Sequence, residues 1–377
     1  MKKILIKLKN KLSSIIKIKL GKHINKKTEK LNKKVVKHHN FSDWFFCVVC
    51  SHKYKNVSLK NRLKMYANGF TSDEYVDYNF EKNNMKEYIT EVERWKSREI
   101  NGKYNVVLDD KRLFYEAFCK YIKIPKTLFY IVKGKFLSYE KDEELSLENI
   151  FELLNIYKGL VIRPISDGGG RGICIVKQIG DKIYLNDDEC DKNTVKDVFK
   201  GQNDSVVSEY VFQHKYANDI FDKSVNTIRI VTIQKENGKA EIPIALHRFG
   251  TKESIPVDNA CNGGIFSIIN LENGTIGKAK SYRTDEIYTK HPDSKAQIEG
   301  ITVPRWNEIK EKVIYVANRF PYIKFIAWDI ALTTNDEINA IEGNASTGLN
   351  VFQSFEPLKN TSLGEFYKKY NVIKWDG

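Results

Sequence analysis

A glycine-rich segment, VIRPISDGGGRGICIVK at residues 161–177, carries the most specific chemical signal of the sequence. Glycine tolerates positive φ and lets backbone N–H groups approach a phosphate closely. A P-loop or a dinucleotide-binding loop would lead into a helix, whereas ICIVK has the composition of a strand. The segment therefore predicts two strands joined by a phosphate-binding loop, and an ordinary glycine-rich hairpin is the alternative. The loop residues with this potential are Gly168, Gly169, Gly170, Arg171 and Gly172.

A second group of candidate ligands lies in WDIALTTNDEINAIEGNASTGLN. Asp329 occupies one predicted strand, Glu342 and Asn344 occupy the next, and TTND between them has the composition of a turn. In such a hairpin Asp329 faces Glu342 and Asn344 on one side of the sheet. Carboxylate and amide oxygens suit Mg²⁺, so the hairpin predicts a metal and nucleotide site. A solvated acidic hairpin is the alternative, although a carboxylate within the apolar run FIAWDIAL needs a partner.

The elements that must position these groups have mixed character. Residues 41–104 lack strand alternation and contain the helical stretches KNRLKMYANGF and NMKEYITEVERWKSREI. From Val106 onward, short β-branched runs alternate with helical patterns, which predicts an α/β fold with α+β lobes. A late helix, WNEIKEKVIYVANRF, places Ile309, Val313, Val316 and Phe320 along one face.

The net charge of +14 in 377 residues is concentrated at the N-terminus. Residues 1–40 contain fourteen lysines and one acidic residue, Glu29, so the remainder is nearly neutral and a nucleic-acid-binding groove is not supported. MKKILIKLKNKLSSIIKIKL has the pattern of a basic amphipathic helix, which suits an anionic membrane surface. A partner-binding helix and a solvated leader are the alternatives.

Six scattered cysteines do not suggest a disulfide framework and fit a reducing compartment. Cys47-Val-Val-Cys50 beside His52, His38 and His39 invites a zinc site, but no second pair of ligands follows, so a buried apolar segment is preferred. No apolar run approaches the ~18 to 20 residues of a membrane span. The sequence predicts a cytoplasmic protein, with peripheral association at the inner face of the membrane as the role of the leader.

Six ordered blocks between about residues 65 and 357 resemble the sugar-transfer-associated family of the ATP-grasp superfamily. They are GFTSDEYVDYN, DDKRLFYEAF, SEYVFQH, SVNTIRIVT, VDNACNGGIF and IEGNASTGLNVFQ. The resemblance implies a glycine-loop lid over ATP and Mg²⁺ held by Asp329, Glu342 and Asn344. It implies that Lys111 reaches the nucleotide phosphates, and that Glu209 with the backbone of Tyr210 and Val211 contacts adenine.

One residue departs from the family pattern, because Arg163 stands where the strand before the glycine loop usually carries a phosphate-binding lysine. Arginine keeps the charge with a different geometry, which puts nucleotide affinity in question. The resemblance also implies that Arg229 stabilises charge at the phosphate and acyl site, with Arg248 as the competing candidate. The predicted substrate-side residues are Asn226, Thr227, Asp258, Asn259, Gly263 and Gly264.

The resemblance implies an ATP-dependent carboxylate–amine ligase that acts through an acyl phosphate in cell-surface polysaccharide or capsule biosynthesis. Its substrates are a small-molecule or saccharide carboxylate and an amine. A kinase that releases its phosphorylated product, and a nucleotide-binding module without catalysis, are the alternatives. The predicted regions are a leader at 1–40, a helical N-terminal region at 41–104, a pre-lid region at 105–160, a lid at 161–212 and a catalytic lobe at 213–377.

Overall fold

The computed structural model describes residues 57–166, 170, 172–284 and 286–373. These residues belong to two compact units, one formed by the chain up to Glu99 together with Gly348–Gly377, the other by Ile100–Thr347. No helix among the described residues has the length and apolar character needed to cross a membrane. The basic leader and the Cys47–Cys50 segment lie outside the described residues.

The first unit is helical in its described part. Its elements are α3 (Leu59–Asn68), α4 (Glu74–Asp77), η2 (Met85–Glu87), α5 (Glu91–Lys96), η3 (Ser97–Glu99), α12 (Asn350–Gln353) and α13 (Ser362–Lys369). The predicted helix at 60–70 is confirmed as α3, whereas the stretch at 84–100 forms three short helices. It is divided because Asn84 caps η2 and Thr90 caps α5 in a capping box with Glu93.

Aromatic side chains form the core of this unit, and a single buried glutamine connects its two chain segments. Gln353 of α12 accepts a hydrogen bond from the backbone N–H of Ile89 and donates to its carbonyl, both at 2.8 Å. The residues of the core are Met65, Phe70, Tyr78, Phe80, Tyr88 and Val92. The C-terminal chain therefore completes the helical unit, while the predicted ranges placed residues 348–377 with the catalytic lobe.

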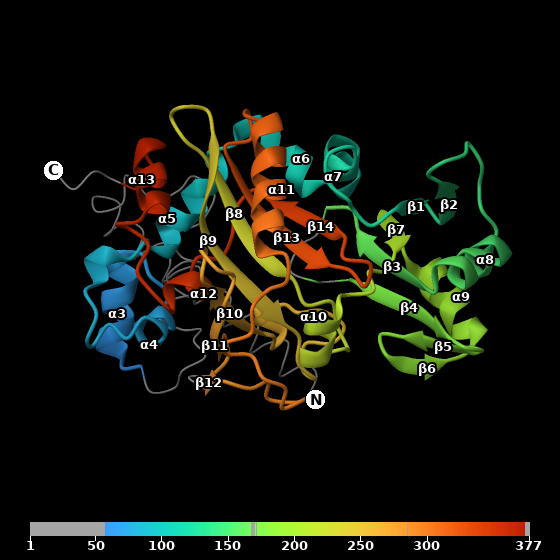
Figure 1. The fold of residues 1–377 in the computed structure, drawn as a ribbon, viewed down its shortest axis with the longest axis horizontal. Helices are drawn as coiled ribbons and strands as arrows, with labels where there is room; N and C mark the ends of the chain where they lie inside the picture. Colours follow the sequence, from blue (N-terminus) through green and yellow to red (C-terminus); the bar gives the residue numbers. More distant parts are fainter. Residues whose placement is uncertain (1–56, 167–169, 171, 285, 374–377) are drawn as a thin grey trace, which may run out of the picture. The chain divides into compact units, whose positions relative to one another are not determined.

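The second unit contains two seven-stranded sheets. The first, in the order β2-β1-β7-β3-β4-β5-β6, is called the lid sheet. Its strands are β1 (Thr127–Val132), β2 (Lys135–Ser138), β3 (Gly159–Pro164), β4 (Cys174–Ile179), β5 (Lys182–Leu185), β6 (Asp188–Cys190) and β7 (Ser205–Glu209). The helices α8 (Leu147–Tyr157) and α9 (Lys192–Gly201) lie against it (Figure 1). This sheet includes residues 127–138, which the predicted ranges separated from the lid.

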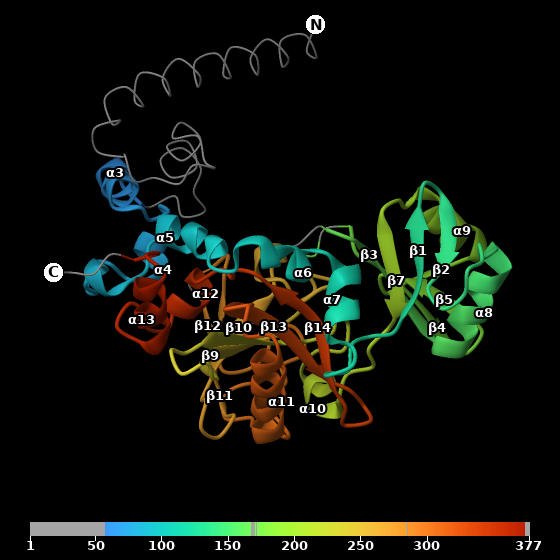
Figure 2. The same ribbon diagram turned by 90° about the horizontal axis from the view of Figure 1, so that it is seen from above.

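The second sheet, in the order β12-β11-β10-β9-β8-β13-β14, is called the C-terminal sheet. The remaining helices of the unit are η4 (Gly102–Tyr104), α6 (Asn105–Asp109), α7 (Lys111–Phe118), α10 (Lys215–Ile220), η5 (Ala260–Asn262) and α11 (Trp306–Arg319). Figure 2 shows the lid strands and the C-terminal strands as separate groups of the unit. The strands are β8 (Ile228–Gln234), β9 (Ala240–Phe249), β10 (Ile265–Ile269), β11 (Ile276–Ser281), β12 (Ile287–Tyr288), β13 (Phe325–Leu332) and β14 (Ile338–Asn344).

Alternation along β13 gives the C-terminal sheet two chemically different faces. Trp328 lies in the same buried cluster as Phe114 of α7 and Val313 of α11, so these helices cover one face. Asp329, the next residue, points to the other face because side chains alternate along a strand. The predicted apolar face of the late helix is confirmed, since Ile309, Val313 and Val316 of α11 are buried.

Candidate functional site

The pairing of β3 with β4 confirms the predicted strand, loop, strand arrangement. Ile162 lies opposite Cys174 and Gly159 lies opposite Lys177, with the glycine segment between the two strands. The alternate residues Leu160, Ile162 and Val176 enter the core of the lid sheet. Arg163 and Lys177 therefore share the opposite face, and Tyr210 follows β7 beside Gly159.

Arg163 is almost fully buried on this face and reaches the C-terminal sheet. Its Nη1 donates a hydrogen bond of 3.1 Å to the carbonyl of Ile341 in β14, and its Nη2 lies 3.4 Å from Ser208 Oγ. Burial lowers the pKa of Arg163 from its ordinary value, and the charge of Glu342 partly offsets this effect. The Nε of Arg163 is buried without a hydrogen-bond partner among the described residues, so this guanidinium keeps a donor for an anion.

The predicted adenine segment follows the end of β7. Glu209 accepts a hydrogen bond of 2.9 Å from the backbone N–H of Lys126, while the N–H of Tyr210 donates to the carbonyl of Gly159. Burial raises the pKa of Tyr210 to about 12, so its phenol stays neutral at physiological pH. Val211 is buried beside it. The segment supplies an apolar surface, and its contact with adenine stays a prediction.

The hairpin of β13 and β14 has the register that the sequence predicts. Asp329 lies opposite Glu342, and Asn344 donates a hydrogen bond of 3.2 Å to Glu342 Oε1. All three side chains therefore occupy one face of the C-terminal sheet. Among the described residues no group of three His, Cys, Asp or Glu residues gathers as a metal site, and this set contains two carboxylates and an amide.

Asp329 is held by two arginines from neighbouring strands. Arg229 donates through Nε to one carboxylate oxygen and through Nη2, at 2.9 Å, to the other. Arg248 Nη2 lies 3.0 Å from the same second oxygen. Burial alone would raise the pKa of Asp329, but the two guanidinium groups hold it below its ordinary value. The carboxylate is therefore ionised in the folded protein at neutral pH.

A second buried carboxylate, Asp258, orients Arg248 through Thr227. Asp258 Oδ2 accepts hydrogen bonds from the N–H and the hydroxyl of Thr227, at 2.8 and 2.5 Å. The Thr227 hydroxyl oxygen accepts from Nε and Nη2 of Arg248 at 3.0 and 2.6 Å. Burial opposes the charge of Arg248, but Asp258, Asp329 and Glu342 together raise its pKa. Asp258 therefore has a positioning role in addition to its predicted place beside a substrate.

The other predicted substrate-side residues have mainly local contacts. Asn226 donates to the carbonyls of Ala217 and Phe221 and accepts from the N–H of Gly250, so its amide holds the chain before β8. Asn259 Oδ1 caps η5, and Gly263 follows that turn with φ of 112°. Gly264 lies so close to the carbonyl of Asp258 that a Cβ would meet it at 2.5 Å. Substrate contact by these residues stays a prediction.

The described part of the glycine loop lies against the segment that precedes η5. A Cβ on Gly170, whose φ is 76°, would lie 3.0 Å from Val257 and 3.5 Å from Asn262. Gly168, Gly169 and Arg171 lie outside the described residues. Lys111 begins α7, and its backbone N–H donates to the carbonyl of Ile165, immediately after β3. The first residue of α7 is thus fixed beside the start of the loop.

These groups suit a magnesium nucleotide. Arg163 keeps an unused buried donor for a phosphate, and Arg229 and Arg248 add positive charge beside the carboxylates. Asp329, Glu342 and Asn344 carry the hard oxygen donors that Mg²⁺ prefers. They would hold the metal if Asp329 gives up part of its contact with Arg229 and Arg248, which occupy both of its oxygens. Bound Mg²⁺ would offset the negative charge of the triphosphate.

Three polar residues of the site were not identified from the sequence. Lys177 shares one face of the lid sheet with Arg163, and its ammonium lies 3.2 Å from Asp187 and 5.6 Å from the centre of the Tyr210 ring. Thr347 accepts a hydrogen bond of 2.7 Å from Arg229 Nη1. The alternation of ICIVK could have revealed Lys177. No local pattern indicates Thr347 or Asp187, which depend on contacts distant in sequence.

The sequence model of the sugar-transfer-associated ATP-grasp family matches residues 92–360. No curated protein sequence matches the chain. Among solved structures, D-alanyl-alanine synthetase A from Vibrio cholerae shares 12% identity, with a TM-score of 0.41 over 71% of this chain and 66% of the other. The ATP-grasp ligase PsnB, complexed with a minimal precursor, shares 11% identity, with a TM-score of 0.36 over 67% and 58%.

The biotin carboxylase domain of Hydrogenobacter thermophilus 2-oxoglutarate carboxylase, in complex with MgADP and bicarbonate, shares 12% identity, with a TM-score of 0.36 over 64% and 41%. This chain spans less than two thirds of the length of each of the three structures. The family match confirms the expected ATP-grasp fold, and the expected cofactors, ATP and Mg²⁺, are consistent with it. Because that match extends over both sheets and over the hairpin of Asp329 and Glu342, the chain belongs to the sugar-transfer-associated ATP-grasp family.

Proposed function

We propose that the protein is an ATP-dependent carboxylate–amine ligase. The observation that carries this proposal is the pairing of Arg229 and Arg248 with Asp329, which lies opposite Glu342. The buried Arg163 adds a further positive charge, since it donates a hydrogen bond to the carbonyl of Ile341, the residue before Glu342. This arrangement alternates fixed positive and negative charge, which would suit a site where a magnesium nucleotide meets an anionic substrate. Fixed charge of this kind stabilises charge that develops in a transition state.

The proposed reaction has two steps. A carboxylate oxygen of the first substrate attacks the γ-phosphorus of ATP, and the bond to ADP breaks, giving an acyl phosphate. The nitrogen of an amine then attacks the acyl carbon, phosphate leaves and the nitrogen loses a proton, giving an amide. Arg229 and Arg248 would stabilise the negative charge on the transferring phosphoryl group and on the acyl phosphate. Arg163 and Lys111 would bind the phosphates.

The proposed substrates are a sugar carboxylate and an amino acid or another amine, joined during assembly of a cell-surface polysaccharide such as a capsule. The family name supports work on sugars. The lysine-rich leader would hold the enzyme at the cytoplasmic face of the membrane, near lipid-linked glycans.

Calorimetric titration of the purified protein with ATP tests the nucleotide site. We expect affinity to increase with Mg²⁺, and we expect Asp329→Asn and Glu342→Gln to remove that increase. The matched control is Asp181→Asn, a substitution in the exposed turn between β4 and β5. Absence of binding at millimolar ATP would overturn the proposal.

The identity of the reaction is tested by trapping the intermediate. Hydroxylamine converts an acyl phosphate into a hydroxamate, so incubation with ATP and a panel of uronic acids should yield a hydroxamate together with ADP. Amide formation on addition of an amine supports the ligase. A stable phosphorylated product that neither hydroxylamine nor amines consume would instead identify a kinase.

A further inference from the structure

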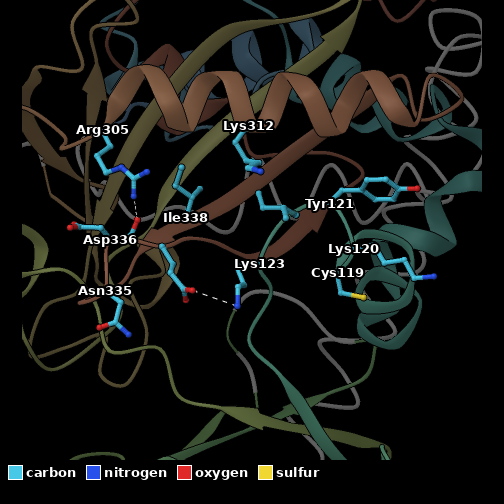
Figure 3. A pocket seen from close by; sticks show the side chains of 11 residues that line it. Cys119, Lys120, Tyr121, Lys123, Arg305, Lys312, Asn335, Asp336 and Ile338 are labelled. Carbon is cyan, nitrogen blue, oxygen red and sulfur yellow. Dashed lines mark hydrogen bonds and ion pairs between the residues drawn. The ribbon is translucent and has the colours of Figure 1, made fainter.

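A cavity of about 490 Å³ lies outside the nucleotide site, on the helix-covered side of the C-terminal sheet. It is open to solvent and is bordered by the residues that follow α7, by α11, and by the turn between β13 and β14 (Figure 3). Ile338 of β14 lines it and lies opposite Leu332, which belongs to the same buried cluster as Trp328. The cavity therefore opens on the face away from Asp329.

Helix α7 and strand β13 each extend from the nucleotide site to the cavity, and their lengths give the separation of the two sites. Lys111 begins α7, whereas the cavity begins at Cys119, eight residues later, which is about 12 Å along a helix. Asp329 lies three residues before Leu332, the last residue of β13, which is about 10 Å along the strand, and the lining residues Asn335, Asp336 and Glu337 follow beyond it. A ligand in the cavity would therefore not share the phosphate-binding groups of the nucleotide site.

The lining of the cavity carries more positive than negative charge. Its cations are Lys120, Lys123, Arg305 and Lys312, and its anions are Asp336 and Glu337. Lys312 extends from α11 (Figure 3), lies 5.8 Å from the centre of the Tyr315 ring and has no ion pair to any described carboxylate. Lys123 lies 3.5 Å from Glu337, a long separation between two exposed groups. Both ammonium groups are therefore available to an added anion.

The turn that forms one wall is well fixed. Arg305 donates to the backbone carbonyl of Asp336, and the side chain of Asp336 lies 3.2 Å from Nε2 of His214. The hydroxyl of Thr333 accepts hydrogen bonds from the N–H groups of Asn335 and Glu337, at 3.2 and 3.1 Å. The wall is thus organised before any ligand binds, which reduces the entropy lost on binding.

We propose that this cavity binds a small hydroxylated anion, namely a monosaccharide or disaccharide that bears a phosphate or a carboxylate. Lys123 and Lys312 would bind the anionic group, since Lys312 has no ion pair among the described residues and that of Lys123 is long. Lys120, which also has no ion pair among the described residues, extends away from the other lining side chains (Figure 3). The carboxylates of the turn would accept hydrogen bonds from sugar hydroxyl groups, and the side-chain amide of Asn335 could both donate and accept them. A purely apolar ligand is disfavoured, because the charged lining would lose water without gaining partners.

Calorimetric titration of the full chain, kept in saturating MgADP so that the nucleotide site is filled, tests this proposal. The probes are glucose 1-phosphate, glucuronate, unmodified glucose and inorganic phosphate. We expect binding of one or both sugar anions, at least fivefold tighter than glucose or inorganic phosphate. Comparison of glucose 1-phosphate with glucuronate shows whether the cavity prefers a phosphate or a carboxylate.

The double variant Lys123→Ala/Lys312→Ala should weaken sugar-anion binding at least tenfold and leave the affinity for MgADP within twofold. The matched control removes two lysines elsewhere, as Lys200→Ala/Lys278→Ala, from exposed positions on α9 and β11. Melting temperatures should remain within a few degrees, because Lys123, Lys200 and Lys278 are exposed and the half-buried Lys312 has no ion pair among the described residues. Absence of binding by either sugar anion, equal affinity for inorganic phosphate, or equal weakening by the control would overturn the proposal.

Discussion

At the scale of single residues, we expect Arg163 to bind the nucleotide phosphates. Its guanidinium donates to the carbonyl of Ile341 and lies near Ser208 Oγ, while Nε has no hydrogen-bond partner among the described residues. The single ammonium of a lysine cannot reach all of these positions at once. We expect Arg163→Lys to raise the KM for ATP severalfold and Arg163→Met to raise it more than tenfold. Steady-state kinetics on ADP release measures both. Unchanged KM values would show that Arg163 supports the sheet without contacting ATP.

Asp258 permits a second prediction at this scale, because it acts on Arg248 both through Thr227 and through a direct ion pair of 3.4 Å to Nε. Asp258→Asn keeps the shape but weakens the acceptor of the Thr227 hydroxyl and removes one charge that stabilises Arg248. We expect kcat to fall ten- to a hundredfold while the Kd for ATP changes less than threefold. Asp258→Glu should recover part of kcat. A loss confined to ATP binding would contradict a role in positioning Arg248.

At the scale of elements, close packing between β3 and the segment after β7 fixes the residues that are predicted to contact adenine. A Cβ added at Gly159 would lie 2.6 Å from the Cβ of Tyr210, which native packing does not allow. We expect Gly159→Ala to destabilise the protein by about 1 to 3 kcal/mol and to weaken ATP binding. Gly201→Ala is the control, because a Cβ there meets nothing within 4 Å. Equal melting temperatures for the two variants would refute this packing argument.

The structure also shows which elements can be predicted from the sequence alone. The strands around the glycine loop and the hairpin of Asp329 and Glu342 follow from local alternation and turn composition, and the register confirms both. The placement of Thr347 beside Arg229 and the return of residues 348–373 to the helical unit depend on contacts between distant segments. Local patterns contain no information on such contacts, so the predicted region boundaries differ from the observed units.

At the scale of the whole molecule, charge divides the chain into a basic leader and a nearly neutral remainder. If the leader binds anionic lipid, the full chain should sediment at low salt with vesicles that contain phosphatidylserine. It should be released at about 0.5 M salt, because the salt screens the attraction between the lysines and the lipid headgroups. Vesicles of phosphatidylcholine alone should bind much less. Equal binding to both lipids would contradict electrostatic recruitment.

The helical unit contains a buried acid that makes its stability depend on pH. Glu74 accepts hydrogen bonds from the N–H of Thr71 and the hydroxyl of Tyr78, but burial, together with the charge of Glu91, raises its pKa to about 8. The folded protein therefore keeps this proton between about pH 4.5 and 8, whereas the unfolded chain releases it. Stability should fall as pH rises through this range, by at most about 1.4 kcal/mol per pH unit from this group.

Replacing Glu74 with glutamine removes the titration and keeps the size of the side chain. We expect the melting temperature of Glu74→Gln to match the parent near pH 5 and to exceed it by several degrees near pH 8. Glu81→Gln, at an exposed position of the same unit, should follow the parent at every pH. Parallel curves for the parent and Glu74→Gln would show that the carboxylate is already ionised in the folded unit. A divergence that grows with pH would show instead that the unit holds a neutral acid in its core at physiological pH.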